Sequence, residues 1–287
     1  MSKKLNLIIY RRIFAYVTKL TIFKLKIMKT SFFKPINLPI AVFSSLLILL
    51  TACSSKKIVN TEIKTYYIEV DQAVAKNQEI DNFLVPYRQH IDEDLSKVLA
   101  YNPQDLDRTS AKWQNPMTNF YADAILEIGN PVFEKRTGKT IDFCLLNYGG
   151  IRSTIAKGTI TTRNAYDIMP FENSAIVLGI DGTTVYEMAT YFMENKTAHP
   201  LSGIEIFADK NTFSVKDIKI KGQSIDKNKV YYVITNDYLA KGGDRMDFFL
   251  KAKESYVLDY KLRNMFIAYF TKIDTLKPST QPRIVLE

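Results

Sequence analysis

Residue types that suit ligand binding gather in one short segment, which runs from Asn147 to Arg152 and reads Asn-Tyr-Gly-Gly-Ile-Arg. An apolar run, Ile141 to Leu146, precedes it, so we expect a strand that ends in a glycine loop. Gly149 and Gly150 let a ligand approach the main chain. The Arg152 guanidinium offers a planar set of donors to phosphate, carboxylate or sugar oxygens. The pattern predicts a ligand pocket, and a structural tight turn with a solvated arginine fits it equally well.

Two further segments carry aromatic and polar side chains that suit a heterocyclic ligand: Met169 to Asn173, and Thr235 to Asp244. A nucleobase has a flat π-face on each side, so Phe171 and Tyr238 could hold one between them, with each stack worth roughly 1–3 kcal/mol. Asp244 lies in a glycine-containing loop and is a candidate acceptor for a sugar diol. Composition alone favours core positions for both rings, because aromatic side chains are mostly buried.

Together these three segments resemble the C-terminal, substrate-binding domain of the 5'-nucleotidases, over a region from about Asp94 to the C-terminus. The matching motifs are Asn-x-Gly-Gly-Ile-Arg, Pro-Phe-x-Asn, and an aromatic residue six positions before the aspartate of Gly-Gly-Asp. The resemblance implies an α+β fold, a mixed sheet with packed helices, that holds a base between Phe171 and Tyr238. It also implies that further residues contact the phosphate, ribose or base or line the pocket: Asn147, Gly149, Gly150, Arg152, Asn173, Gly203 and Asp244.

The residues that would hydrolyse a phosphate ester are not evident in the chain. In this family a separate N-terminal domain holds two metal ions through His, Asp and Asn residues, whereas this sequence has two histidines, His90 and His199, outside any such motif. The resemblance therefore implies a substrate-binding half without catalytic residues, metal or cofactor of its own. Its expected partner is a separate metallophosphatase polypeptide that carries two divalent metal ions.

The start of the matched region departs from the family pattern. Trp113 and Gln114 stand where the family commonly has an arginine and a glutamate. Lys112 or Arg108 offers a cation nearby, but a lysine is a point charge and not a bidentate fork. This departure argues against tight phosphate binding and leaves a nucleoside as a ligand.

The N-terminal residues predict export and lipidation. Ile40 to Leu50 is an apolar stretch preceded by Lys29 and Lys34, and it is shorter than the roughly twenty residues that span a bilayer. The sequence Leu50-Thr51-Ala52-Cys53 resembles a bacterial lipobox. We therefore expect a signal region over residues 1–52, with a true start possible at Met28, lipid on Cys53, a tether over residues 53–62 and one domain over residues 63–287. The expected location is the cell envelope, in the outer membrane facing the periplasm, with no nucleic-acid partner.

The high basicity of the whole sequence belongs to this signal region. The sequence carries 39 Lys and Arg against 30 Asp and Glu, a net charge of +9, and residues 1–52 contain nine of the basic residues and no acidic ones. The remainder has no net charge, so a nucleic-acid-binding function inferred from high pI fails. Cys144 is then the one cysteine left, and its apolar neighbours favour an inert core position.

Hydrophobic periodicity predicts the elements that position these residues. We expect helices over residues 77–101, interrupted or kinked at Pro86, and over 119–133, with a break near Gly129 to Pro131. Another helix should begin at Thr184, whose spacing to Glu187 fits a capping box, and a last one near Tyr260. The expected strands cover residues 63–70, 141–146, 158–162, 175–180, 204–207, 213–220, 230–234 and 284–286.

The sequence thus predicts a nucleotide- or nucleoside-binding domain of a 5'-nucleotidase type of phosphate ester hydrolase, with hydrolysis dependent on another chain. A non-enzymatic lipoprotein that captures nucleosides, or a scaffold that keeps only the fold, is the alternative.

Overall fold

A computed structural model describes residues 64–67 and 77–287 of the chain. The predicted signal region, the lipidated Cys53 and the tether lie outside the described residues. Of the strand expected over residues 63–70, residues 64–67 are described, and they belong to no helix or strand. No helix among the described residues is long and apolar enough to cross a membrane.

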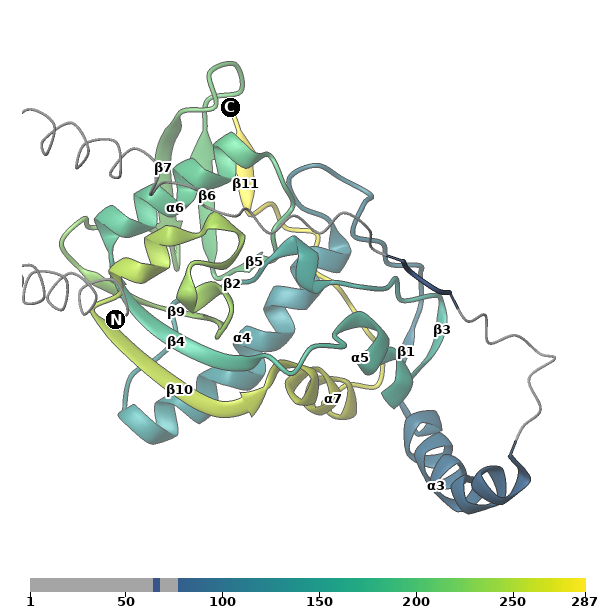
Figure 1. Cartoon of the computed structure of the whole chain (residues 1–287). Coiled ribbons are helices and arrows are strands. Elements are labelled where there is room, and N and C mark those ends of the chain that lie inside the picture. The colour runs from purple at the N-terminus through teal and green to yellow at the C-terminus, as the bar shows by residue number, and fades with distance from the viewer. Residues whose placement is uncertain (1–63, 68–76) are drawn as a thin grey trace, which may run out of the picture. The chain divides into compact units, whose positions relative to one another are not determined.

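The strands of residues 77–287 form three sheets, shown in Figure 1. A central mixed sheet has the order β10-β4-β9-β2-β5, in which β9 and β2 are parallel and the other neighbours antiparallel. Its strands are β2 (Phe143–Leu145), β4 (Ser174–Asp181), β5 (Leu201–Ser202), β9 (Val230–Asn236) and β10 (Glu254–Lys261). A second sheet has the order β11-β6-β7-β8, with β6 (Ile204–Ala208), β7 (Val215–Ile220), β8 (Gln223–Ser224) and β11 (Ile284–Leu286). β1 (Val98–Asn102) pairs with β3 (Gly158–Thr161).

The central sheet separates two hydrophobic cores, and the alternation of side chains along its strands explains why. Along β4, Val177 belongs to one core while Ile176 and Leu178 belong to the other, and along β9 Ile234 and Val233 divide in the same way. Both faces of these strands are buried, so they carry continuous apolar runs and not a polar face. This arrangement fixes the strand register, because a slip of one residue would exchange the two cores.

Helices cover both faces of this sheet. α4 (Pro116–Thr137) and α7 (Leu262–Lys272) contribute to one core, and α6 (Gly182–Asn195) packs into the other with the second sheet. The remaining helices are α3 (Gln78–Ser96) and α5 (Thr162–Ile168), and the short 3-10 turns are η1 (Tyr148–Gly150), η2 (Leu239–Lys241), η3 (Gly243–Arg245) and η4 (Asp247–Lys251). The mixed sheet with packed helices confirms the expected α+β class.

Neither α3 nor α4 is interrupted at its proline, and the alternative of a kink at Pro86 stays a prediction. α3 continues through Pro86 to Ser96, and β1 rather than further helix follows it. α4 begins at Pro116 and continues through Pro131 to Thr137. Contacts with other parts of the chain hold α4 there. The Asn130 side chain accepts a hydrogen bond from the Ile141 amide, and Gly129 lies against Ile234. Tertiary packing thus outweighs the local cost of the proline.

The expectation that α6 begins at Thr184 is also wrong. The helix begins at Gly182, and Asp181 is its N-cap residue, accepting from the Thr184 amide at 2.9 Å. Thr184 therefore lies in the first turn, and its hydroxyl donates to the same carboxylate. Glu187 instead forms an ion pair with Lys251. An aspartate is at least as good an N-cap as a threonine, and here it closes the preceding strand as well.

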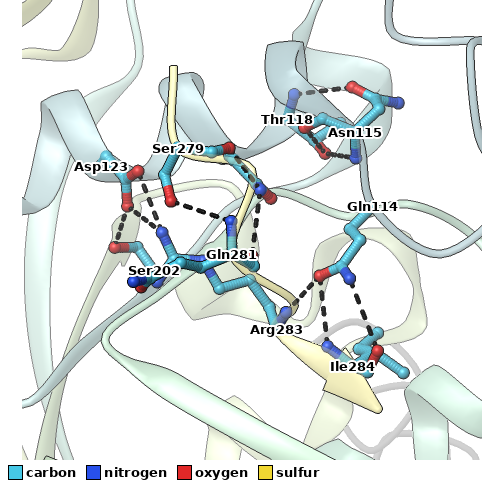
Figure 2. A network of polar contacts seen from close by, with 10 residues as sticks. Gln114, Asn115, Thr118, Asp123, Ser202, Ser279, Gln281, Arg283 and Ile284 are labelled. Carbon is cyan, nitrogen blue, oxygen red and sulfur yellow. Dashed lines mark hydrogen bonds and ion pairs between the residues drawn. The ribbon is translucent and has the colours of Figure 1, made fainter. Parts of the chain in front are cut away.

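A polar network anchors the C-terminal segment to α4, as Figure 2 shows. Arg283 donates to both carboxylate oxygens of Asp123, which also accepts from the Ser202 hydroxyl. The pKa of Asp123 is raised because burial disfavours its charged form, although Ser202 and Arg283 oppose that shift. The Gln114 side chain accepts from the backbone amides of Arg283 and Ile284. Gln114, which departs from the family pattern, thus helps to hold β11 in place.

Candidate functional site

The topology of the central sheet brings three loops to one edge. β2 and β9 are parallel, so the loops that follow them leave the sheet on the same side. β4 runs antiparallel to β9 with Ala175 opposite Asn236, so the segment before β4 meets the loop after β9. The Asp237 amide donates to the Ser174 carbonyl and extends this contact by one residue. The loops after β2 and β9 and the segment before β4 therefore lie together at one edge of the central sheet.

A cavity of about 330 Å³ opens at this point. It is lined by Asn147, Gly149, Gly150, Arg152, Met169, Phe171, Asn173, Asn236, Tyr238 and Asp244. Eight of the nine predicted binding residues are in this set, and Gly203 is the exception. The structure thus brings together residues that lie up to 97 positions apart, as the contact between Asn147 and Asp244 illustrates. Their contacts with a ligand stay a prediction.

The two candidate clamp rings are neither buried nor in contact with each other. Phe171 is 40% exposed and Tyr238 is 46% exposed, which excludes the alternative that both are core aromatics. Both line the cavity, and no ring contact joins them to each other in the described part of the chain. The Arg152 guanidinium lies 5.6 Å from the centre of the Phe171 ring. An open cavity bordered by two accessible rings is what a flat heterocycle requires.

Hydrogen bonds to Asp244 fix the Tyr238 ring. The Tyr238 hydroxyl donates to one Asp244 carboxylate oxygen at 2.8 Å, and this bond raises the pKa of the hydroxyl. Gly243 lies flat against the ring, since a Cβ atom there would be 2.5 Å from a ring carbon. Asp244 itself has a φ of 54°, an uncommon left-handed conformation for a residue with a side chain. The Gly-Gly-Asp sequence is therefore needed to place both the ring and the carboxylate.

The same carboxylate also orients Asn147. The Asn147 amide group donates to the second Asp244 oxygen at 2.8 Å, and the Tyr191 hydroxyl donates to the Asp244 carbonyl at 2.9 Å. Each carboxylate oxygen can accept more than one hydrogen bond, so Asp244 keeps acceptor capacity for a sugar hydroxyl.

Arg152 is a cation at the rim of the cavity. Its side chain is bonded to the Gly149 carbonyl at 3.4 Å, and it forms no ion pair among the described residues. Its other donors are therefore available to an anionic or oxygen-rich ligand group.

Arg108 and His199 support the glycine loop from outside the cavity. Arg108 donates to the carbonyls of Tyr148 and Ile151 and stacks on the Tyr148 ring at 4.6 Å. His199 accepts the Tyr148 amide at Nδ1, and burial lowers the pKa of His199 to about 4, with Asp244 in partial opposition. Arg108, which the sequence offered as a substitute phosphate ligand, thus makes its contacts with the loop carbonyls.

A buried arginine, Arg263, holds the segment that carries Phe171. It donates to the carbonyls of Met169 and Phe171, and it forms an ion pair with Glu172. Its side chain is 8% exposed, so these carbonyls would lack a partner without it. The sequence signal for this role is an arginine within the apolar pattern of the last helix.

Gly203 does not line this cavity, which corrects the expectation from the sequence. It lies at the junction of β5 and β6, beside a separate cavity of about 610 Å³. Its φ is 80°, and a Cβ atom would be 2.6 Å from the Asp142 carbonyl oxygen. A glycine is required there for backbone conformation and close packing.

Trp113 lies outside the cavity and packs against Phe213 with ring centres 5.8 Å apart. Met169 and Asn236 also line the cavity, and neither was among the predicted binding residues. The Asn236 side chain accepts from the Leu239 amide and caps the turn that carries Tyr238. No group of three or more His, Cys, Asp or Glu side chains suited to a metal ion exists among the described residues, so these residues do not fit a two-metal site.

Comparison with known proteins identifies the family. The model of the 5'-nucleotidase C-terminal domain matches residues 94–251, more than half of the chain, and the chain belongs to this family. UshA of Escherichia coli is 25% identical over 193 residues, which are 66% of this chain and 34% of UshA. The trifunctional nucleotide phosphoesterase YfkN of Bacillus subtilis is 26% identical over 251 residues, 81% of this chain and 17% of YfkN. The chain thus spans about a third or less of these two relatives.

Solved structures confirm the fold. The 5'-nucleotidase precursor of Thermus thermophilus has a TM-score of 0.59 at 23% identity, over 72% of this chain and 42% of that one. The NAD nucleotidase of Haemophilus influenzae has a TM-score of 0.56 at 19% identity, over 73% of this chain and 41% of that one.

Proposed function

We propose that this domain binds a nucleoside or nucleotide, with the base between Phe171 and Tyr238. The observation that carries the proposal is that both rings line one open cavity without touching each other. Arg152, Asn147 and Asp244 surround the same space and suit the phosphate and sugar of such a ligand. The loop glycines Gly149 and Gly150 let the ligand approach the backbone.

Hydrolysis, in this proposal, requires a metallophosphatase on another polypeptide. The relatives UshA and YfkN are longer than the region that this chain matches, and the described residues lack a metal-ligand cluster. The partner would supply two divalent metal ions, and this chain would bind the substrate and fix its orientation. Such positioning contributes to catalysis because it converts an encounter between molecules into a reaction within one complex.

The proposed location is the cell envelope, with a lipid on Cys53 as the membrane anchor. The sequence Leu50-Thr51-Ala52-Cys53 after an apolar stretch supports it. Mass spectrometry of the mature N-terminus tests it: an N-terminal Cys53 that carries lipid is expected, and an unmodified Cys53 within a longer chain would contradict it.

Binding and catalysis can be tested separately. The purified chain is titrated calorimetrically with adenosine, AMP and a UDP-sugar, and phosphate release from AMP is then measured with and without cell-envelope extract. We expect binding by the chain alone and hydrolysis only with the extract. Binding without hydrolysis in either sample would favour the alternative of nucleoside capture, and absence of binding would favour a scaffold.

A further inference from the structure

Asn173 is the polar cavity-lining residue nearest in sequence to Phe171, and a residue outside the cavity lining holds its side chain. The Asn173 amide nitrogen donates to an Asp237 carboxylate oxygen at 3.1 Å. Asn173 lines the cavity, whereas Asp237 does not. The register of β4 on β9 places the two residues side by side, and the bond from the Asp237 amide to the Ser174 carbonyl secures that placement.

This hydrogen bond decides which atom of Asn173 is left for a ligand. An ionised carboxylate is an acceptor only, so the face of Asn173 that meets Asp237 must be its NH₂ group. The carbonyl oxygen of the Asn173 side chain forms no hydrogen bond with any described residue. One of the two amide N–H donors of Asn173 is thus taken by Asp237, while the side-chain oxygen stays free as an acceptor for a ligand.

We propose that Asp237 is a positioning residue that makes this site select bases with an exocyclic amino group. Adenine and cytosine carry such a group, whereas hypoxanthine and uracil carry an oxygen in its place. An amino group on the base edge donates to the Asn173 oxygen, and an oxo group places two acceptors against each other. This inference rests on the proposed function, because it needs a base stacked on Phe171 with its edge toward Asn173.

Cytidine and uridine form the sharpest pair of probes, since they share the sugar and the ring size and differ in the amino or oxo group at C4 and in the proton on N3. Adenosine and inosine form the second pair. We expect the purified chain to bind the amino member of each pair roughly tenfold more tightly, because a mismatched acceptor loses a hydrogen bond and gains an unpaired partner. Equal affinities within both pairs would overturn the inference.

The substitution Asp237→Asn tests the role of Asp237 itself. An asparagine at 237 can donate to the Asn173 oxygen, which allows the Asn173 amide to turn its NH₂ group toward the ligand. We expect the tenfold preference to shrink to less than about threefold while stacking on Phe171 is retained. Asp167→Asn is the matched control, because it makes the same change of charge at an exposed residue outside the cavity lining, and it should keep the preference.

The outcomes separate this inference from the proposed function. A preference that persists unchanged in Asp237→Asn would overturn the inference while nucleoside binding stands. Loss of binding for all four nucleosides in the unaltered chain would overturn both. The ratio of two affinities is the readout, so a general loss of stability in a variant, which weakens both members of a pair, leaves the ratio interpretable.

Discussion

At the scale of single residues, the candidate site depends on two rings that are held differently. Tyr238 is fixed by its own loop, through the carboxylate of Asp244 and the flat contact with Gly243. Phe171 has no such bond and contacts the guanidinium of Arg152. Hydrogen bonds thus hold the Tyr238 ring, whereas the Phe171 ring borders the Arg152 cation.

Replacing Phe171 with alanine removes one stacking surface. We expect nucleoside affinity to fall by about 1–3 kcal/mol, with little change in stability because the side chain is 40% exposed. Phe83→Ala is a suitable control, since Phe83 is an exposed phenylalanine of α3 outside the cavity lining. Calorimetric titration of both variants with adenosine checks this expectation, and equal affinities would refute the clamp.

Gly243→Ala should weaken binding although it leaves every cavity side chain in the sequence. The new methyl group would lie 2.5 Å from the Tyr238 ring, so the ring must move from its place and its bond to Asp244 must lengthen. We expect an affinity loss comparable with that of Phe171→Ala. An unchanged affinity in Gly243→Ala would show that the ring is not held as we describe.

At the scale of elements, α7 holds the loop that carries Phe171, although the two are far apart in the sequence. Arg263 of α7 bonds the carbonyls of Met169 and Phe171. Lys261, at the end of β10, donates to the Glu172 carbonyl and the Ser174 hydroxyl. The position of Phe171 thus depends on both α7 and β10.

Arg263→Met tests this dependence, since methionine fills much of the volume without replacing the donors. We expect a stability loss of about 1–3 kcal/mol, because two carbonyls lose their partner, together with weaker nucleoside binding. Arg136→Met is the control, since the Arg136 side chain is 44% exposed. Urea denaturation and titration measure the two effects. A variant with normal stability and affinity would show that the loop does not need its hydrogen bonds to Arg263.

The order of the elements was largely predictable from hydrophobic periodicity, whereas their ends were not. The strands that became β4, β9 and β11 and the helices that became α6 and α7 lie close to their expected ranges, because each carries a long apolar pattern. The start of α6 depended on which of two neighbouring residues, Asp181 or Thr184, caps the helix, and the continuity of α4 depended on contacts with distant residues, such as Ile141 and Ile234. A single sequence does not reveal such contacts.

At the scale of the whole molecule, the glycine loop rests on a buried histidine whose charge depends on pH. Burial lowers the pKa of His199 to about 4, from about 6.5 when exposed. Its neutral form is therefore favoured in the folded chain, so its contribution to stability is complete above pH 6.5 and decreases as the pH falls toward 4. We expect a loss of about 2 kcal/mol between pH 7 and pH 5 from this group.

His199→Gln isolates that contribution, since glutamine can accept the Tyr148 amide without taking up a proton. The free energy of unfolding, measured in urea from pH 7 to pH 5, should decrease less steeply in this variant than in the unaltered chain. Parallel slopes for the two proteins would mean that His199 is not buried as a neutral group.

Motifs in three segments predicted most of the residues that line the cavity. The arrangement of these residues in space depends on the strand pairing of the central sheet. Asn147, Phe171 and Tyr238 were identifiable from local patterns, and the pairing of β9 with both β2 and β4 brings them together. Gly203 was misplaced because a glycine required by backbone conformation looks the same in the sequence as one that admits a ligand. Asp237 and His199 act through contacts with other parts of the chain, which no local pattern reveals.

The most direct test of the account is a crystal structure of the chain grown with adenosine. We predict electron density for the adenine ring between Phe171 and Tyr238, parallel to both, with the ribose hydroxyls within hydrogen-bonding distance of Asp244. Adenosine bound elsewhere, or a cavity without ligand at a concentration where calorimetry shows saturation, would contradict it.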